Sequence, residues 1–204
     1  TAMWKSLLEN PEKPLLDKTT SGLYPPGSLF KPVVILAALE NNIPIPNVFC
    51  TGKYMLGSHT FHCWKEKGHG AINIITALEK SCDVFFYALA QKVGIDKLVK
   101  MAQKFGFGEL SGLNFPSEKK GLLPSKEWKK LKRKQPWLPG DTILTAIGQG
   151  YWQSTPLQMA IMMARLASGK MITPRIYLED NPTVFPSLDI SEESLQTVRQ
   201  GMWG

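Results

Sequence analysis

The chain has 204 residues, of which 43% are hydrophobic and 20% are charged, and these ordinary proportions exclude the disordered and fibrous classes of protein. Apolar runs such as Val33–Leu39 fall far short of the roughly 18 residues that a membrane-spanning helix needs. The net charge of +7 is concentrated in Lys126–Lys134, with no zinc knuckle, aromatic RNA-binding pattern or arginine-rich arm, so we expect no nucleic-acid partner. This basic segment is typical of a solvated helical face, with a membrane-facing patch as the alternative.

A helix buried on all sides is predicted in the first quarter of the chain. Residues Leu29–Leu39 are apolar around the full helical circumference. Pro32 is compatible with a helix only in its opening turn, so we expect the helix to begin close to Ser28. Residues 41–70 are rich in Gly, Pro, Cys and His without a sustained period, which predicts a folded loop or a small hairpin.

The remaining predicted elements are mostly helices, because capping residues recur at helical distances. In chain order they are a helix from Asn73 to about Lys80, a helix over about 84–93 ending at Gly94, a short helix capped by Asp96 and ending at Gly106, a short helix after Asp141, a Met-rich helix framed by Thr155 and Gly169, a strand over Ile172–Leu178 and a last helix opened by Ser191.

Ser28 and Lys31 form a Ser-x-x-Lys pattern, which on a helix places both side chains on one face, one turn apart. In a dry site such a lysine can lose its proton and act as a base toward the serine hydroxyl, and this pair opens the most apolar helix of the chain. The alternative is a capping serine followed by an exposed lysine. The same spacing recurs at Ser117–Lys120, in a polar loop where we expect no function.

Ser81 is a second candidate for a reactive hydroxyl group. It lies in the sequence Ser81-Cys82-Asp83, between two predicted helices. No Asp–His pair supports a conventional triad, because every histidine lies between positions 59 and 69. Ser81 joined to Ser28 and Lys31 predicts a serine acyl-transfer enzyme with a lysine base. The alternative is that Ser81 is a cap or kink residue.

Four segments of the chain carry a family resemblance. Tyr24–Pro32 closely resembles the nucleophile segment of class B penicillin-binding proteins, above all their elongation-type branch, penicillin-binding protein 2, and Ser81-Cys82-Asp83 resembles the second motif of that branch. Residues 138–158, with Leu138-Pro139-Gly140-Asp141 and Gly148-Gln149-Gly150, and residues 198–203 are similar to later stretches of the same domain. The third motif of the family, Lys-Thr-Gly, does not occur in residues 1–204.

The resemblance implies an α/β transpeptidase fold, with helices packed on a central, mainly antiparallel sheet, of which residues 1–204 would be a partial domain that stops before the third motif. It implies a serine D,D-transpeptidase that cross-links peptidoglycan stem peptides and that β-lactams acylate. Ser28 would attack the penultimate D-alanine carbonyl, Lys31 would take the proton, Ser81 would relay it and Asp83 would orient the site. Asp83 stands where many relatives carry Asn, and its charge favours a protonated Lys31.

The same resemblance implies where the protein works and with what. Its substrate would be a stem peptide ending in D-Ala-D-Ala, and its partners a membrane glycosyltransferase and scaffold proteins of the elongation complex. The domain would lie on the periplasmic side of the bacterial inner membrane, anchored by an N-terminal helix outside the given chain. The alternatives are a non-catalytic scaffold module of the same complex and a zinc-binding regulator in which the Ser28 motif occurs by chance.

The cysteines and histidines of the chain are confined to one region, residues 50–82. Cys50, Cys63, His69 and Cys82 are separated by 13, 6 and 13 positions, and three thiolates with one imidazole suit a closed structural zinc site. Some members of the resembling branch hold zinc at matching positions, which implies a zinc-binding loop region over residues 43–82. A Cys50–Cys63 disulfide with a buried free Cys82 is the alternative.

Three aromatic residues are candidates for the substrate approach, namely Trp64, Tyr151 and Trp152. We expect Tyr151 and Trp152 in particular to bind substrate. Packing in the core or at its rim is the alternative for each of them.

Overall fold

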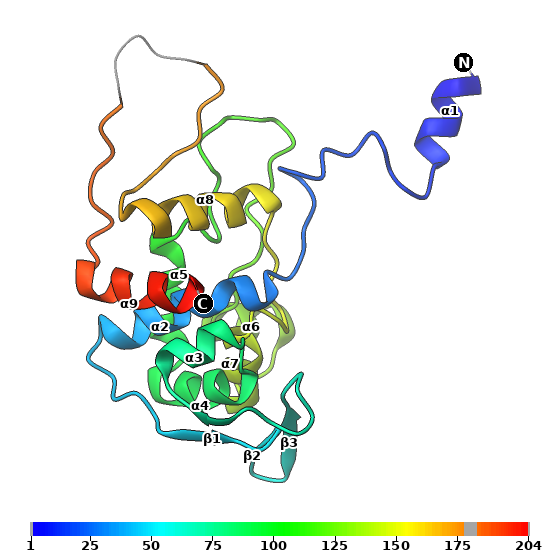
Figure 1. The fold of residues 1–204 in the computed structure, drawn as a ribbon. Coiled ribbons are helices and arrows are strands. Elements are labelled where there is room, and N and C mark those ends of the chain that lie inside the picture. Colours follow the sequence, from blue (N-terminus) through cyan, green and yellow to red (C-terminus); the bar gives the residue numbers. More distant parts are fainter. Residues whose placement is uncertain (1, 178–182, 204) are drawn as a thin grey trace.

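The helix predicted to be buried on all sides lies at the centre of the fold. In the computed structural model, which describes residues 2–177 and 183–203, a 3-10 turn, η1 (Gly27–Phe30), leads into α2 (Lys31–Leu39). The residues from Lys31 to Ala38 are all buried, and Pro32 lies in the first turn. Figure 1 shows α2 among the other helices. The prediction of a buried helix that begins next to Ser28 is confirmed.

Eight further helices lie in the described residues. They are α1 (Ala2–Glu9), α3 (Ile74–Glu79), α4 (Asp83–Val93), α5 (Ile95–Lys104), α6 (Lys126–Arg133), α7 (Pro139–Ala146), α8 (Pro156–Ser168) and α9 (Glu192–Trp203). The predicted caps Asn73 and Thr155 both close capping boxes, with Thr76 and Gln158 respectively. The cap predicted at Asp96 is wrong, because Gly94 is the N-cap of α5 and Asp96 lies within its first turn.

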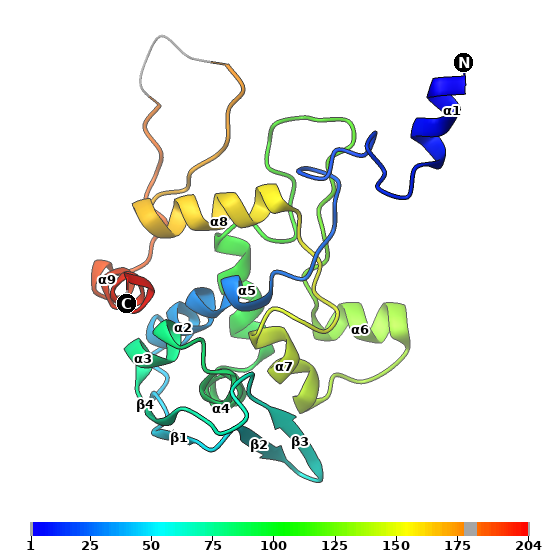
Figure 2. The same ribbon diagram turned by 45° about the vertical axis from the view of Figure 1, so that its right-hand side comes forward.

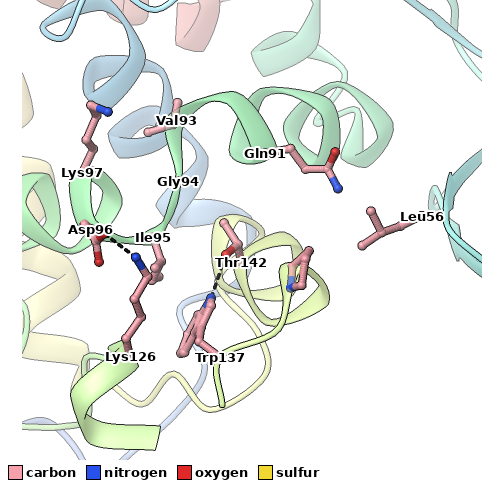
Figure 3. Close-up of a pocket in the computed structure, with 11 residues that line it drawn as sticks. Leu56, Gln91, Val93, Gly94, Ile95, Asp96, Lys97, Lys126, Trp137 and Thr142 are labelled. Atoms are coloured by element: carbon pink, nitrogen blue, oxygen red, sulfur yellow. Dashed lines mark hydrogen bonds and ion pairs between the residues drawn. The ribbon is translucent and has the colours of Figure 1, made fainter. Parts of the chain in front are cut away.

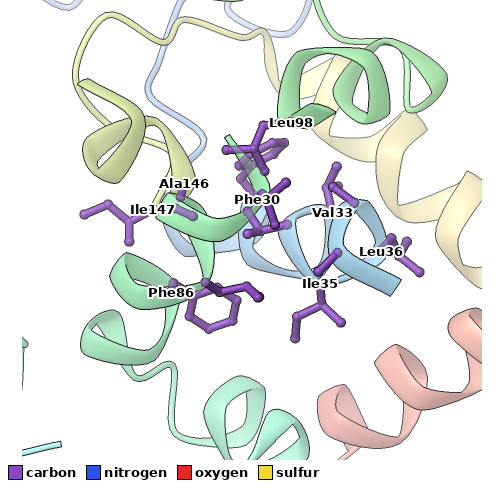
Figure 4. Packing of buried hydrophobic residues seen from close by; sticks show 14 of the residues in the cluster. Phe30, Val33, Ile35, Leu36, Phe86, Leu98, Ala146 and Ile147 are labelled. Carbon is purple, nitrogen blue, oxygen red and sulfur yellow. The ribbon is translucent and has the colours of Figure 1, made fainter. Parts of the chain in front are cut away.

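The core forms where α4, α5 and α7 pack around η1 and α2. Phe30, Ile35, Phe86 and Leu98 are all fully buried, and Figure 4 shows them clustered with further apolar side chains of the same elements. A fully buried side chain of this size contributes about 1.5–3 kcal/mol relative to an exposed one. Phe30, the residue before Lys31, is therefore held firmly in the core.

The strands of the described residues form two small antiparallel sheets. β1 (Val48–Cys50) pairs with β4 (Gly70–Ile72), with Cys50 opposite Gly70, and β2 (Lys53–Leu56) forms a hairpin with β3 (His59–His62). A larger central sheet does not occur within this part of the chain. The strand predicted over Ile172–Leu178 is not formed at residues 172–177, and residue 178 lies outside the described residues.

Helix α1 stands away from the other helices. Both views of the ribbon show it projecting from the body of the fold at the end of an extended segment (Figures 1 and 2), and none of its residues is buried. In the described residues, no helix combines the length and the apolar character needed to cross a bilayer.

Candidate active site

Ser28 lies at the surface, next to residues that are buried in the core. Ser28 is exposed, whereas Phe30 and Lys31 are buried. The ring of Phe30 lies 4.3 Å from the ring of Trp152 and 5.9 Å from that of Phe107, measured between centroids. The short turn η1 therefore places a reactive hydroxyl at the surface of a rigid part of the core.

The side chain of Lys31 is surrounded by three oxygen acceptors. Its Nζ donates to the backbone oxygen of Ser81 (2.9 Å), to Ser81 Oγ (2.8 Å) and to Asp83 Oδ1 (2.6 Å). Lys31 is 1% exposed, and its Nζ also lies 5.3 Å from the ring centroid of Phe86. An ammonium group has three N–H donors, so this set of acceptors matches it fully.

Ser81 connects Lys31 to Ser28. Its Oγ lies 3.0 Å from Ser28 Oγ, within hydrogen-bond distance, and among the described residues no hydrogen bond joins Lys31 to Ser28 directly. Ser81 has a left-handed backbone conformation, with φ of +47°. A non-glycine residue in this region is strained, and such strain concentrates at functional sites. The turn between α3 and α4 thus directs the Ser81 hydroxyl at both partners.

Asp83 is held from two sides at the first turn of α4. Its Oδ1 accepts from Lys31, and its Oδ2 accepts from the backbone N–H of Trp64 (3.1 Å). The indole Nε1 of Trp64 donates to the backbone oxygens of Lys80 and Ser81, both at 3.1 Å. Trp64, a candidate for the substrate approach, therefore fixes the backbone of Ser81 while 64% of its surface remains exposed. Sequence spacing gave no sign of this contact.

Ser28, Lys31 and Ser81 line one shared pocket of about 350 Å³. Apolar side chains from η1, α2, α3, α8 and α9 supply much of its wall, namely Leu29, Pro32, Leu78, Met163 and Met202. Three polar groups that converge in a partly apolar pocket are typical of a binding or catalytic site. The three residues predicted for acyl transfer are therefore brought together, and Asp83 lies directly behind them.

The four predicted metal ligands also converge. Cys50 ends β1, Cys63 follows β3, His69 precedes β4 and Cys82 caps α4, yet their ligand atoms all lie within 4.8 Å of one another. The Nδ1 of His69 is 3.6 Å from Cys50 Sγ and 3.5 Å from Cys63 Sγ. The three cysteines are buried, and no disulfide joins them. A tetrahedral zinc ion, with Zn–S bonds of about 2.3 Å, needs sulfur atoms about 3.8 Å apart, so the donor set fits the ion.

Burial shifts the pKa values of two groups in this cluster, Cys82 and His69. Desolvation, with Cys50 and Cys63 nearby, raises the pKa of the Cys82 thiol to about 12, so without a cation this thiol stays protonated at neutral pH. Desolvation also lowers the pKa of His69 below its usual value, and Lys65 and Lys80 add to this effect. His69 is therefore neutral, which is the form of imidazole that binds a metal ion. Its Nε2 is buried and has no hydrogen-bond partner in the described residues.

Comparison with known proteins agrees with this geometry. The profile of the penicillin binding protein transpeptidase domain matches residues 3–204. The chain belongs to this family.

Individual relatives and solved structures of the transpeptidase family are similar over nearly the whole chain. Peptidoglycan D,D-transpeptidase MrdA of Escherichia coli K12 is 38% identical over 98% of the chain, which covers 33% of that protein. The solved penicillin-binding protein PBP2 of Helicobacter pylori is 36% identical with a TM-score of 0.92, covering 100% of this chain and 39% of that one. PBP2 of Pseudomonas aeruginosa, solved in complex with WCK 5153, is 36% identical with a TM-score of 0.87, covering 98% and 46%.

These matches confirm the transpeptidase fold expected from the sequence. The chain spans about a third of the length of the curated relatives it matches. The family assignment is therefore firm for residues 3–204, and the activity of the whole protein is a matter for proposal.

The two aromatic residues after the Gly148-Gln149-Gly150 stretch lie outside the Ser28 pocket. Trp152 is 1% exposed and its ring packs against Phe30 and Phe107, so it lies in the core beneath Ser28, as the packing alternative for this residue predicts. Tyr151, half-buried, packs against Trp128 of α6 at 5.1 Å between centroids. Neither residue lines the pocket that contains Ser28. An aromatic residue after a glycine-rich turn carries no sequence signal of which way it points.

A larger cavity of the domain lies apart from these residues. It measures about 560 Å³ and lies between the junction of α4 with α5 and the start of α7 (Figure 3). The Asp96–Lys126 ion pair and the Trp137–Thr142 hydrogen bond cross it. None of the predicted catalytic or metal-binding residues lines it.

Gly148 makes a close backbone contact with the turn that carries Ser28. Its carbonyl oxygen accepts from Gly27 N–H at 2.9 Å, its φ is +68°, and a Cβ added at this position would lie 2.2 Å from the carbonyl oxygen of Gly27. Only glycine allows this approach.

Gly148→Ala is therefore expected to destabilise the domain by about 2–4 kcal/mol, because the added methyl group must push the Gly27 backbone away. Urea unfolding measures the loss. Gly57→Ala is the matched control, since Gly57 also has a positive φ, +58°, but has open space around it. Equal losses for the two variants would contradict the close contact.

Proposed function

We propose that this domain carries out serine D,D-transpeptidation of peptidoglycan stem peptides. The observation that carries the proposal is the hydrogen-bonded series from Lys31 Nζ through Ser81 Oγ to Ser28 Oγ, at 2.8 and 3.0 Å, at the wall of an open pocket. The names of the relatives, peptidoglycan D,D-transpeptidases, support it. The complex of a related PBP2 with WCK 5153 supports a pocket that accepts small molecules.

In the proposed reaction Ser28 Oγ forms a bond to the carbonyl carbon of the penultimate D-alanine of the substrate. In the structure Ser81 Oγ donates to Ser28 Oγ, so this hydrogen bond must first reverse; Ser28 then gives its proton to Ser81 Oγ, and Ser81 passes its own proton to Lys31 Nζ. The bond to the terminal D-alanine breaks, and its nitrogen takes up a proton from the same pair. An amine of a second stem peptide then forms a bond to the ester carbonyl carbon, the bond from that carbon to Ser28 Oγ breaks, and the amine proton passes through the same pair to Ser28 Oγ, which completes the cross-link.

The role of Asp83 in this proposal is to orient Lys31. The carboxylate contacts Lys31 Nζ at 2.6 Å and the Trp64 N–H at 3.1 Å, which fixes the lysine toward Ser81. Lys31 Nζ contacts three oxygen acceptors in this arrangement, so one of these contacts must weaken before Lys31 can accept a proton.

The test uses the full-length protein and benzylpenicillin, followed by intact-protein mass spectrometry and peptide mapping. We expect one adduct per chain, located on Ser28. A folded protein that forms no adduct would overturn the enzyme proposal and favour the non-catalytic scaffold module.

We further propose that Cys50, Cys63, His69 and Cys82 hold a structural zinc ion. The convergence of three thiols and one neutral imidazole within 4.8 Å supports this proposal. When bound, the ion would convert the buried thiols to thiolates and tie the 43–82 region to the start of α4. Cys82 lies between Ser81 and Asp83, so the ion would fix the backbone of both residues.

The zinc proposal predicts the metal content of the purified protein. We expect about one zinc ion per chain, and in Cys50→Ser most of this zinc is lost. The melting temperature of Cys50→Ser should fall by roughly 5–10 °C, as expected for a loss of about 2–3 kcal/mol in a domain of this size. Elemental analysis and thermal unfolding measure both. His59→Ala, which changes an exposed residue of β3 within the same 43–82 region, should keep its zinc. A zinc-free parent would contradict the proposal, especially if Cys50 and Cys63 proved to be disulfide-bonded.

The cellular setting is proposed by analogy with the relatives. Helicobacter pylori PBP2 has been solved in complex with MreC, and another similar structure, at 29% identity with a TM-score of 0.76, belongs to a peptidoglycan synthase complex. We propose that the protein works with a membrane glycosyltransferase and elongation scaffold proteins, on the periplasmic side of the inner membrane, where an N-terminal helix outside residues 1–204 anchors it.

A further inference from the structure

Helix α6 and the residue that follows it carry a group of cations without acidic partners. Lys126 pairs with Asp96, and Lys129 pairs with Asp141. In the part of the chain that the structure describes, no carboxylate lies within ion-pair distance of the other four cations, which are all exposed: Lys130, Lys132, Arg133 and Lys134. Because the whole chain has a net charge of +7, this group is a large share of its uncompensated charge.

One of these cations is held in place by aromatic rings. The guanidinium carbon of Arg133 lies 5.5 Å from the ring centroid of Tyr151 and 6.0 Å from that of Trp128. The two rings are themselves in contact, at 5.1 Å. Stacking on aromatic faces orients the planar guanidinium but leaves its N–H groups free to donate. An oriented guanidinium that is accessible to solvent is suited to bind a carboxylate through two parallel hydrogen bonds.

This group is connected to the Ser28 turn by a short backbone path. Gly148 contacts Gly27, the residue before Ser28, and Tyr151 lies only three residues further along the chain. The three residues from Gly148 to Tyr151 span at most about 11 Å. A peptide bound with its reactive carbonyl at Ser28 that runs along this path directs its upstream carboxylates toward Arg133.

We propose that Arg133, oriented by Trp128 and Tyr151, binds a free carboxylate of an acidic stem peptide, upstream of the two D-alanines. This inference rests on the proposed function, and it adds a specificity contact outside the pocket of Ser28. A membrane surface is the less suitable partner, because Leu131 is the one strongly exposed apolar side chain within α6, and a helix that lies in a bilayer surface needs a broad apolar face.

The test measures peptide binding to the full-length protein by fluorescence anisotropy. The probes are a labelled pentapeptide that ends in D-Ala-D-Ala and carries one glutamyl carboxylate, and the same peptide with that carboxylate amidated. We expect the acidic peptide to bind more tightly to the parent, and Arg133→Glu to weaken its binding about fivefold to tenfold, with little effect on the amidated peptide. Lys100→Glu is the matched control, since Lys100 is exposed on α5 and its reversal changes the net charge equally.

Three outcomes would overturn the inference: equal binding of the two peptides to the parent, equal effects of Arg133→Glu and Lys100→Glu, or an effect of Arg133→Glu confined to binding of phosphatidylglycerol vesicles. Benzylpenicillin acylation of Arg133→Glu, run in parallel, should match that of the parent because Arg133 lies outside the Ser28 pocket. If the parent forms no penicillin adduct, the proposed enzyme activity fails, while the anisotropy data still decide whether Arg133 binds the carboxylate.

Discussion

Ser28→Ala is expected to abolish the penicillin adduct and to lower transpeptidation by at least about 10⁴-fold, because no other described hydroxyl could replace the nucleophile in the Lys31–Ser81 series. Ser28 is exposed, and within residues 2–177 and 183–203 its side chain forms a hydrogen bond only with Ser81. The substitution should therefore shift the melting temperature by no more than about 2 °C. Intact-protein mass and a fluorescent-penicillin gel assay measure the adduct, and thermal unfolding measures the fold.

The chain supplies its own control for this variant. Ser117 and Lys120 have the same Ser-x-x-Lys spacing, in the loop where no function was expected, and Ser117 is exposed. Ser117→Ala should keep a full adduct. An adduct that persists in Ser28→Ala would show that another residue is the nucleophile and would refute the proposed mechanism.

Lys31→Met is expected to have two separate effects. Acylation by penicillin should slow by about 10³-fold, the typical contribution of a positioned general base. The free energy of unfolding should fall by about 3 kcal/mol, because Asp83 is left without its charged partner, and both side chains are largely buried, with 2% and 15% of their surfaces exposed. Stopped-flow acylation and urea unfolding measure the two effects.

A double variant separates these effects. In Lys31→Met/Asp83→Asn the unpaired charge is removed, so most of the stability should return while acylation stays slow. Recovery of acylation in the double variant would show that Lys31 acts only through stability.

A second buried ion pair provides the matched control. Lys129 and Asp141 are also 2.6 Å apart, with 3% and 13% of their side chains exposed, but they lie on α6 and α7. Lys129→Met should destabilise the fold by a similar amount and leave acylation within about threefold of the parent. A similar loss of acylation in both variants would mean that instability alone explains the effect.

The sequence predicts local features of this domain better than features that depend on tertiary packing. The caps at Asn73 and Thr155 were predictable because each acts within its own helical turn. The position of Asp96 was misjudged because Gly94, at φ +77°, serves as both the end of α4 and the start of α5. Residues 172–177 alternate like a strand but form no strand in the described structure.

In the candidate site, too, the sequence predicts local contacts better than contacts that depend on tertiary packing. Spacing alone linked Ser28 to Lys31, since one helical turn separates them. The contacts of Lys31 with Ser81 and Asp83 join residues 50 and 52 positions apart. The residues alone made Ser81 a candidate partner, whereas the role of Asp83 followed only from the family resemblance. The Trp64 contacts with Ser81 and Asp83 and the Gly148 contact with Gly27 have no sequence signature, because each depends on where a loop meets the core.

The buried position of Cys82 limits which substitutions this domain can tolerate over evolutionary time. Cys82 is completely buried among Cys50, Cys63 and His69, and its peptide bonds lead directly to Ser81 and Asp83. A mutation at residue 82 would therefore disturb two neighbours at once. One of them, Ser81, lines the pocket, so we expect few substitutions at residue 82 to be tolerated. Leu29 and Met202, which also line the pocket, are more tolerant of substitution, because they are 47% and 42% exposed. A bulkier side chain at either of these two positions would narrow the pocket and leave the reacting groups in place.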